Sequence, residues 1–123
     1  MKLKNDFFCI KDACQTETGI NYTIGLNPEH FIYQVHFPNN PVTPGVYIIQ
    51  IIQELLEEVL ERTLFMKKLH NGKFLNVINP LENNEVIFSI SISSEGNDAH
   101  KISAVVSNEN HQFAKLSMLF VNQ

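Results

Sequence analysis

The feature that most constrains this fold is an apolar segment that begins directly after a proline. Between residues 46 and 60, apolar side chains occupy nearly every side of a helix at first, and charged residues appear only from Glu54 onward. A helix that is apolar nearly all round must be buried by other elements. We expect it to have Thr43 as its N-cap, Pro44 as its first residue and an end near Leu69. A helix of about 24 residues is about 36 Å long, enough to cross the concave face of a curved sheet.

The rest of the chain follows the period-two pattern of β-strands, with turn residues between the runs. The predicted strands are residues 6–11, 19–26, 73–79, 84–94, 100–107 and 112–121. One helical turn is predicted at 28–33, and a turn at Asn71-Gly72 follows the long helix. This order predicts an α+β fold in which one antiparallel sheet wraps around a central helix.

Length and charge limit the classes of protein to consider. A chain of 123 residues without repeats or linkers predicts a single domain, residues 1–123. Its net charge of −4 argues against a protein that binds nucleic-acid phosphates. The apolar run at 46–52 is interrupted by Gln50 and is far too short to cross a membrane.

The N-terminal sequence and the cysteines favour the cytoplasm. The first residues include two lysines but lack the apolar core of a signal peptide. Cys9 and Cys14 have no partners at metal-ligand spacing, so we expect buried or half-buried free thiols, no metal and no cofactor.

Residues 35–46 bring together a titratable side chain, several prolines and a glycine at a helix start. The prolines fix a loop that holds His36 near the helix N-terminus. The first-turn amides around Gly45 and Val46 can donate hydrogen bonds to a carbonyl oxygen or an anion. This segment is therefore the predicted site.

The same segment resembles the 3-hydroxyacyl-(acyl carrier protein) dehydratases of the FabA/FabZ type. Their pattern is present here as His36-Phe37-Pro38, then Pro41, then Pro44-Gly45-Val46. The order of predicted elements, including Phe74 just after the helix, extends the resemblance over nearly the whole chain. The resemblance implies the hot-dog fold and a lyase acting on acyl thioesters in fatty-acid or related polyketide or polyene synthesis.

In that family the histidine removes the C2 proton, the helix-start glycine amide binds the thioester carbonyl, and a helix carboxylate from the other subunit assists departure of the hydroxyl. The resemblance places the first two roles on His36 and Gly45. The residues it implies around the substrate are Phe37, Pro44, Gly45, Val46 and Phe74. The carboxylate position, fourteen residues after the histidine, is Gln50, and Glu54 lies one turn later, where the family often has Gln.

Gln50 and Glu54 leave three functions open. An amide can hold a hydroxyl but cannot give it a proton, an assistance typically worth about 10² to 10⁴ in rate. We favour a dehydratase in which Gln50 and Glu54 join His36 as catalytic residues, with Glu54 as a displaced acid. The alternatives are a non-catalytic or half-catalytic subunit that binds acyl carrier protein or a catalytic paralogue, and a thioesterase in which Glu54 directs water.

The expected partners follow from the same reasoning. The substrate would be a thioester of acyl carrier protein or coenzyme A. A meander around one helix leaves an edge strand that must be paired or protected, so we expect a homodimer, a heterodimer with a paralogue, or a higher oligomer.

Overall fold

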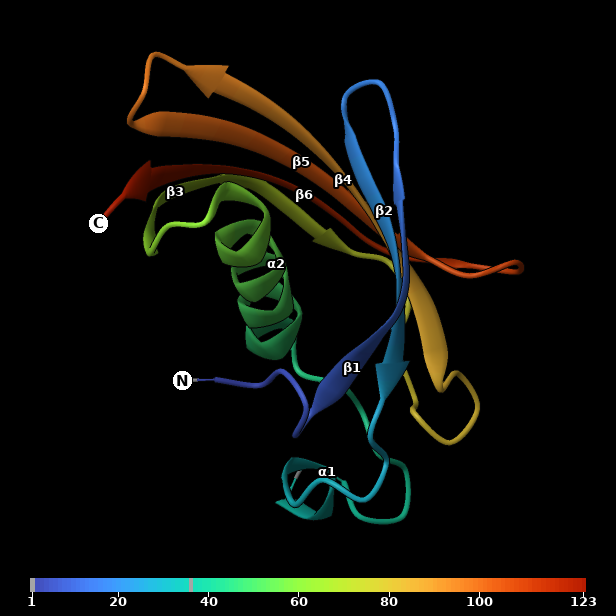
Figure 1. The fold of residues 1–123 in the computed structure, drawn as a ribbon. Coiled ribbons are helices and arrows are strands. Elements are labelled where there is room, and N and C mark those ends of the chain that lie inside the picture. The colour runs from blue at the N-terminus through green and yellow to red at the C-terminus, as the bar shows by residue number, and fades with distance from the viewer. Residues whose placement is uncertain (1, 36) are drawn as a thin grey trace.

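The computed structural model describes residues 2–35 and 37–123, without the side chain of Glu95. Within these residues, one curved six-stranded sheet wraps around a helix (Figure 1). The elements are β1 (Phe8–Gln15), β2 (Gly19–Leu26), α1 (Ile32–Val35), α2 (Gly45–Leu60), β3 (Leu64–Phe74), β4 (Glu85–Glu95), β5 (Ala99–Ser107) and β6 (Gln112–Asn122). The strand order β1-β2-β4-β5-β6-β3 is antiparallel throughout and leaves β1 and β3 at the edges. The predicted α+β architecture is confirmed.

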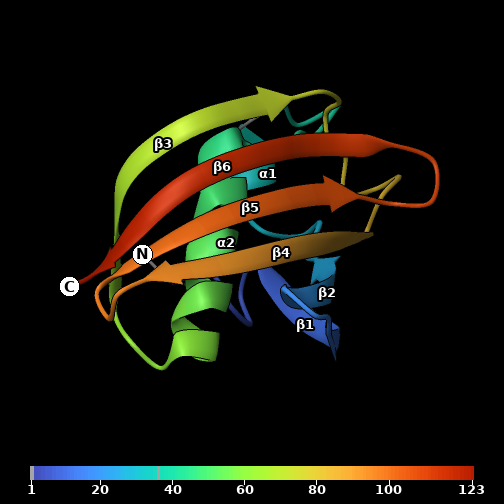
Figure 2. The same ribbon diagram turned by 90° about the horizontal axis from the view of Figure 1, so that it is seen from above.

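Helix α2 lies against the concave face of the sheet, where it forms the centre of the core (Figure 2). Its buried apolar side chains are Ile48, Ile51, Ile52, Leu55 and Leu56. The inward-facing side chains of β4, β5 and β6 that share this core include Phe88, Ile90, Ala104, Val106, Met118 and Phe120. The all-round apolar pattern therefore predicted burial correctly.

The predicted end of the helix near Leu69 is wrong. Helix α2 ends at Leu60, and its C-cap Glu61 has the left-handed conformation, with φ 52°. Residues 64–69, predicted as the last helical turns, and Asn71-Gly72, predicted as a turn, belong to β3 instead. Because β3 ends at Phe74, the strand predicted at 73–79 is correct only for its first two residues. Two register shifts in the pairing of β3 with β6 interrupt its period-two pattern, so the alternation that identifies a strand is lost.

The predicted helix start is wrong by one residue. Pro44 is the N-cap, with extended backbone angles of φ −63° and ψ 145°, and no side chain caps the helix. The Thr43 hydroxyl is hydrogen-bonded to the Tyr33 hydroxyl at 2.8 Å instead. Gly45 is consequently the first residue of α2.

Strand β1 differs from the prediction in its extent and in the environment of its cysteines. It covers residues 8–15 rather than 6–11, and most of its side chains are exposed because it lies at the sheet edge. Cys9 and Cys14 are free thiols, as expected, but both are exposed, so the predicted burial is wrong. No helix in the described part of the chain is long and apolar enough to span a membrane.

Candidate active site

The loop that contains the predicted site is anchored on both sides of His36. Tyr33 is buried and bonds Thr43, whose backbone N–H donates to the Ile78 carbonyl at 2.9 Å. The Asn79 amide donates to Asn40 at 3.2 Å. His36 itself lies outside the described residues, so its role as the catalytic base stays a prediction. The described parts of the loop are nevertheless fixed against the helix start.

Tyr33 is a structural group rather than an acid or base. Burial raises the pKa of its hydroxyl to about 12, and the hydrogen bond with Thr43 lowers it only partly. The hydroxyl therefore keeps its proton near neutral pH. This makes Tyr33 a fixed link between α1 and the start of α2.

Gly45 and Phe74, both expected near the substrate, are in direct contact. A Cβ atom added to Gly45 would lie 2.9 Å from Cζ of Phe74 and 3.1 Å from its Cε1. The Phe74 ring thus covers the helix start at a distance that only glycine allows. Because Phe74 ends β3, the edge strand forms one wall of the predicted site.

The other residues expected around the substrate have largely accessible side chains. Phe37 is 62% exposed and Val46 is 67% exposed, whereas Pro44 is partly buried. Phe37 has φ 64°, a left-handed conformation that is rare for residues with a Cβ atom and is concentrated at functional sites. The site therefore presents an apolar surface next to the first-turn amides of α2.

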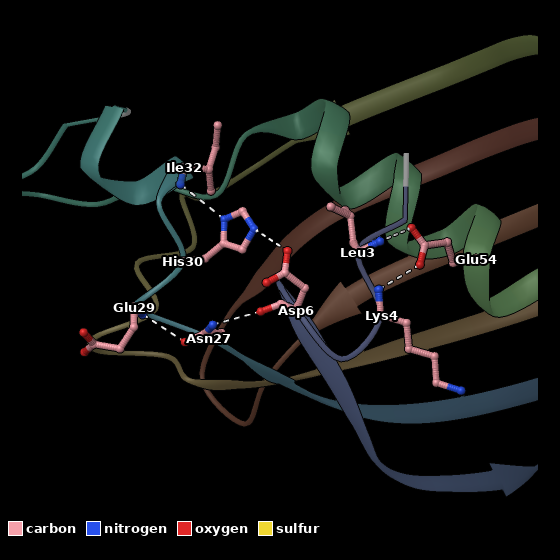
Figure 3. A network of polar contacts seen from close by, with 8 residues as sticks. All are labelled: Leu3, Lys4, Asp6, Asn27, Glu29, His30, Ile32 and Glu54. Carbon is pink, nitrogen blue, oxygen red and sulfur yellow. Dashed lines mark hydrogen bonds and ion pairs between the residues drawn. The ribbon is translucent and has the colours of Figure 1, made fainter.

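Gln50 and Glu54 are brought together one turn apart on α2. The Gln50 Nε2 donates to Oε2 of Glu54 at 2.9 Å. Glu54 is only 5% exposed, and its carboxylate also accepts hydrogen bonds from the backbone N–H groups of Leu3 and Lys4 (Figure 3). Sequence reasoning missed these last two contacts, because nothing local links residues fifty positions apart.

The cavity beside Glu54 is strongly polar. A cavity of about 600 Å³ is lined mainly by charged side chains, including Lys2, Lys4, Glu57 and Arg62, which does not suit an acyl chain. Within residues 2–35 and 37–123, no three His, Cys, Asp or Glu side chains gather as metal ligands would.

Known proteins similar to this chain include dehydratases. The family model for ApeI-like proteins, described as ApeI dehydratase, matches residues 12–116. The FabZ 3-hydroxyacyl-(acyl carrier protein) dehydratase of Latilactobacillus sakei is 27% identical over 95 residues, 72% of this chain and 68% of that protein. The FabZ of Caulobacter vibrioides is 37% identical over 57 residues, but the match covers only 39% of this chain and 36% of that protein.

Solved structures show the same fold at low sequence identity. The dehydratase heterocomplex ApeI:P from Xenorhabdus doucetiae has a TM-score of 0.68 and 15% identity, covering 92% of this chain and 96% of that chain. The thioesterase HI1161 from Haemophilus influenzae has a TM-score of 0.64 and 12% identity, covering 93% and 76%. Since the family model spans most of the sequence, the chain belongs to the ApeI-like dehydratase family and is a hot-dog protein similar to 3-hydroxyacyl-(acyl carrier protein) dehydratases.

Proposed function

We propose that the protein is a lyase that removes water from a 3-hydroxyacyl thioester of acyl carrier protein or coenzyme A. The observation that carries this proposal is the helix start. Gly45 is the first residue of α2, so its amide has no acceptor within the helix. The Phe74 ring lies against it, and the loop that leads to His36 is anchored beside it. An oxyanion that develops on a thioester carbonyl would be stabilised there.

In the proposed reaction His36 removes the C2 proton while the Gly45 amide donates to the thioester oxygen. The electrons of the C2–H bond form the C2=C3 double bond, and the C3–O bond breaks. Gln50 holds the departing hydroxyl by a hydrogen bond but cannot protonate it. The proton that completes the water therefore comes from the His36 imidazolium, which has just received the C2 proton.

The thioesterase alternative is less well supported by the contacts of Glu54. A carboxylate that directs water needs an accessible oxygen, whereas Glu54 is buried and accepts three hydrogen bonds from its own chain. The non-catalytic subunit remains the second candidate, because Gln50 replaces the residue that would act as the acid.

We place the protein in the cytoplasm, where the exposed thiols of Cys9 and Cys14 would stay reduced.

Incubation of the purified protein with 3-hydroxyacyl thioesters, followed by mass spectrometry, tests the proposal. A conjugated enoyl thioester, lighter by one water, is the expected product. Release of free thiol would identify a thioesterase. If no enoyl thioester forms with or without a paralogue present, the lyase proposal is wrong.

Substitution of Gly45 by alanine is expected to lower turnover about tenfold or more with little change in stability. The added Cβ must displace the Phe74 ring, and small displacements at a reacting centre are costly in rate. Alanine is also a better helix former than glycine, which offsets the cost of moving the ring. Steady-state kinetics and thermal unfolding measure the two effects.

Gly72→Ala provides a matched control for this substitution. Gly72 lies on β3 as Phe74 does, but its added Cβ would make only ordinary contacts, at 3.5 Å from Leu69 and Leu116. Its turnover should therefore stay near that of the wild type. Equal activity of Gly45→Ala and Gly72→Ala would remove the helix start from the mechanism.

We further propose that the active assembly is a dimer with this chain or with a paralogue. β3 is an edge strand, and exposed apolar side chains occur on it and just beyond it: Phe65, Leu69, Phe74, Leu75 and Val77. Gly45 and Gln50 are five residues apart, which places the two positions about 140° apart around the axis of α2. This favours a site in which the two residues come from different subunits. The dehydratase heterocomplex of Xenorhabdus doucetiae supports a paralogue as partner.

The dimer is expected to be seen by sedimentation at micromolar concentration, either for the chain alone or after mixing with a paralogue. Burial of the apolar edge of β3 supplies the driving force. A stable monomer under both conditions would contradict the shared site.

A further inference from the structure

We infer that Glu54 is a positioning residue: its carboxylate holds Gln50 and also fixes the N-terminal segment, residues 3–6, which in turn holds the loop before His36. The inference rests on the proposed function for its catalytic consequence. Its structural part, a connection between α2 and the loop through the N-terminal segment, stands on contacts between described residues.

The first end of the connection is buried against α2. The backbone N–H of Leu3 donates to Oε2 of Glu54 at 2.7 Å, and that of Lys4 donates to Oε1 at 2.9 Å. The Leu3 side chain is itself in the core, and the Lys4 ammonium pairs with Glu58 at 2.9 Å. Glu54 therefore anchors two successive backbone amides that would otherwise lose their hydrogen bonds.

The same carboxylate sets the orientation of Gln50. An ionised carboxylate only accepts hydrogen bonds, so the NH₂ end of the Gln50 amide must face Glu54, as the Nε2 distance of 2.9 Å indicates. With both oxygens engaged by N–H donors, Glu54 is suited to hold neighbouring groups rather than to give a proton to a substrate. Glu54 acts through Gln50 in this inference.

The second end of the connection is a buried imidazole. Asp6 is hydrogen-bonded to Nε2 of His30 at 3.1 Å, and Nδ1 of His30 accepts the backbone N–H of Ile32 at 3.2 Å (Figure 3). These partners define the neutral tautomer, with the proton on Nε2. The Asn27 side-chain amide donates to the Asp6 backbone carbonyl at 2.8 Å, which is a second hydrogen bond between the N-terminal segment and the loop. Ile32 begins α1, which ends at Val35, directly before His36.

Four residues thus join the two parts of the chain to which the chemistry is assigned. One end meets α2 one turn after Gln50, and the other fixes the short helix before His36. Both anchoring side chains, Glu54 and His30, are buried, so loss of either set of bonds leaves polar groups without partners, which is costly. Motion of the N-terminal segment would therefore be transmitted to both.

The structural part is tested by amide hydrogen exchange of the full chain carrying Glu54→Gln. This variant keeps the size of the side chain but replaces an acceptor oxygen by a donor, so one of the Leu3 and Lys4 amides faces another N–H group. Exchange at residues 3–6 and at 30–35 should accelerate about tenfold or more, the scale for a buried hydrogen bond left unmade. Glu58→Gln, the matched control, removes only the exposed ion pair with Lys4 and should change exchange less than about threefold.

Asp6→Ala tests the other end by removing the carboxylate that bonds Nε2 of the buried His30. Asp6 is exposed, so the variant should fold. It should accelerate exchange at residues 30–35 while the Leu3 and Lys4 amides stay protected by Glu54. If neither variant affects residues 30–35, the N-terminal segment does not connect the two parts and the inference is overturned.

The catalytic part is tested by the kinetics of Glu54→Gln. The expected result is a fall in kcat of about tenfold, with a smaller change in KM and a pH profile of unchanged shape, because no titrating catalytic group is removed. Loss of a limb of the pH profile would make Glu54 the proton donor and contradict a positioning role. If the wild type forms no enoyl thioester at all, the proposed function fails, whereas the exchange pattern still decides the connection.

Discussion

Replacement of His36 by alanine is expected to reduce formation of the enoyl thioester by at least about 10²-fold, the lower end of the contribution of a general base. In the proposed mechanism the imidazole both takes the C2 proton and returns a proton to the departing hydroxyl. Both steps are therefore lost together. Mass-spectrometric rates for the variant and the wild type measure the effect.

The same substitution should leave the fold nearly unchanged, because a loop side chain contributes mainly to chemistry. Thermal unfolding of the variant checks this. His111→Ala is a suitable control, since His111 is exposed and lies just before β6, within the turn that follows β5. Equal turnover of the two variants would exclude His36 from the mechanism.

The sequence predicted the centre of the fold well because burial leaves a periodic signal. The apolar residues of α2 and the alternation of β4, β5 and β6 reflect which side chains face the core. β3 left a weaker signal, since its register shifts break the alternation and most of its side chains are exposed at the sheet edge. The helix was consequently predicted too long, and the strand that follows it too late.

The candidate site, like the fold, could be predicted from the sequence only in part. The helix start and its glycine were predictable, because Pro44-Gly45 has local consequences for the backbone. The contact of Phe74 with Gly45 and the anchoring of Leu3 by Glu54 depend on the tertiary fold, and no local pattern indicates them. Glu54 in particular has the helical spacing of a solvated residue, yet it is buried because the N-terminal segment covers it.

The substitution Gln50→Glu is expected to raise turnover by up to about 10²-fold, since it supplies the proton donor that the amide cannot be. The new carboxyl would lie next to Glu54, at the place of a 2.9 Å hydrogen bond. Two neighbouring carboxylates cannot both ionise easily, so the repulsion favours a protonated acid at position 50. That state is the one needed to protonate a departing hydroxyl near neutral pH. Product formation measured across pH 5 to 8 (roughly the range in which histidine titrates) tests this.

The paired substitution Gln50→Glu/Glu54→Gln separates the acid from the anchoring carboxylate. It restores a donor and an acceptor between the two positions with the direction reversed, and it places Glu before Gln, the order that FabA/FabZ-type dehydratases often have. It also leaves one of the Leu3 and Lys4 amides without its carboxylate acceptor. If position 50 limits the reaction, the pair should be faster than the wild type but slower than Gln50→Glu alone, because the acid is gained while the N-terminal segment is loosened. Equal rates for the pair and for Gln50→Glu would mean that the anchor has no part in turnover, and no gain in either would show that the missing acid does not limit this protein.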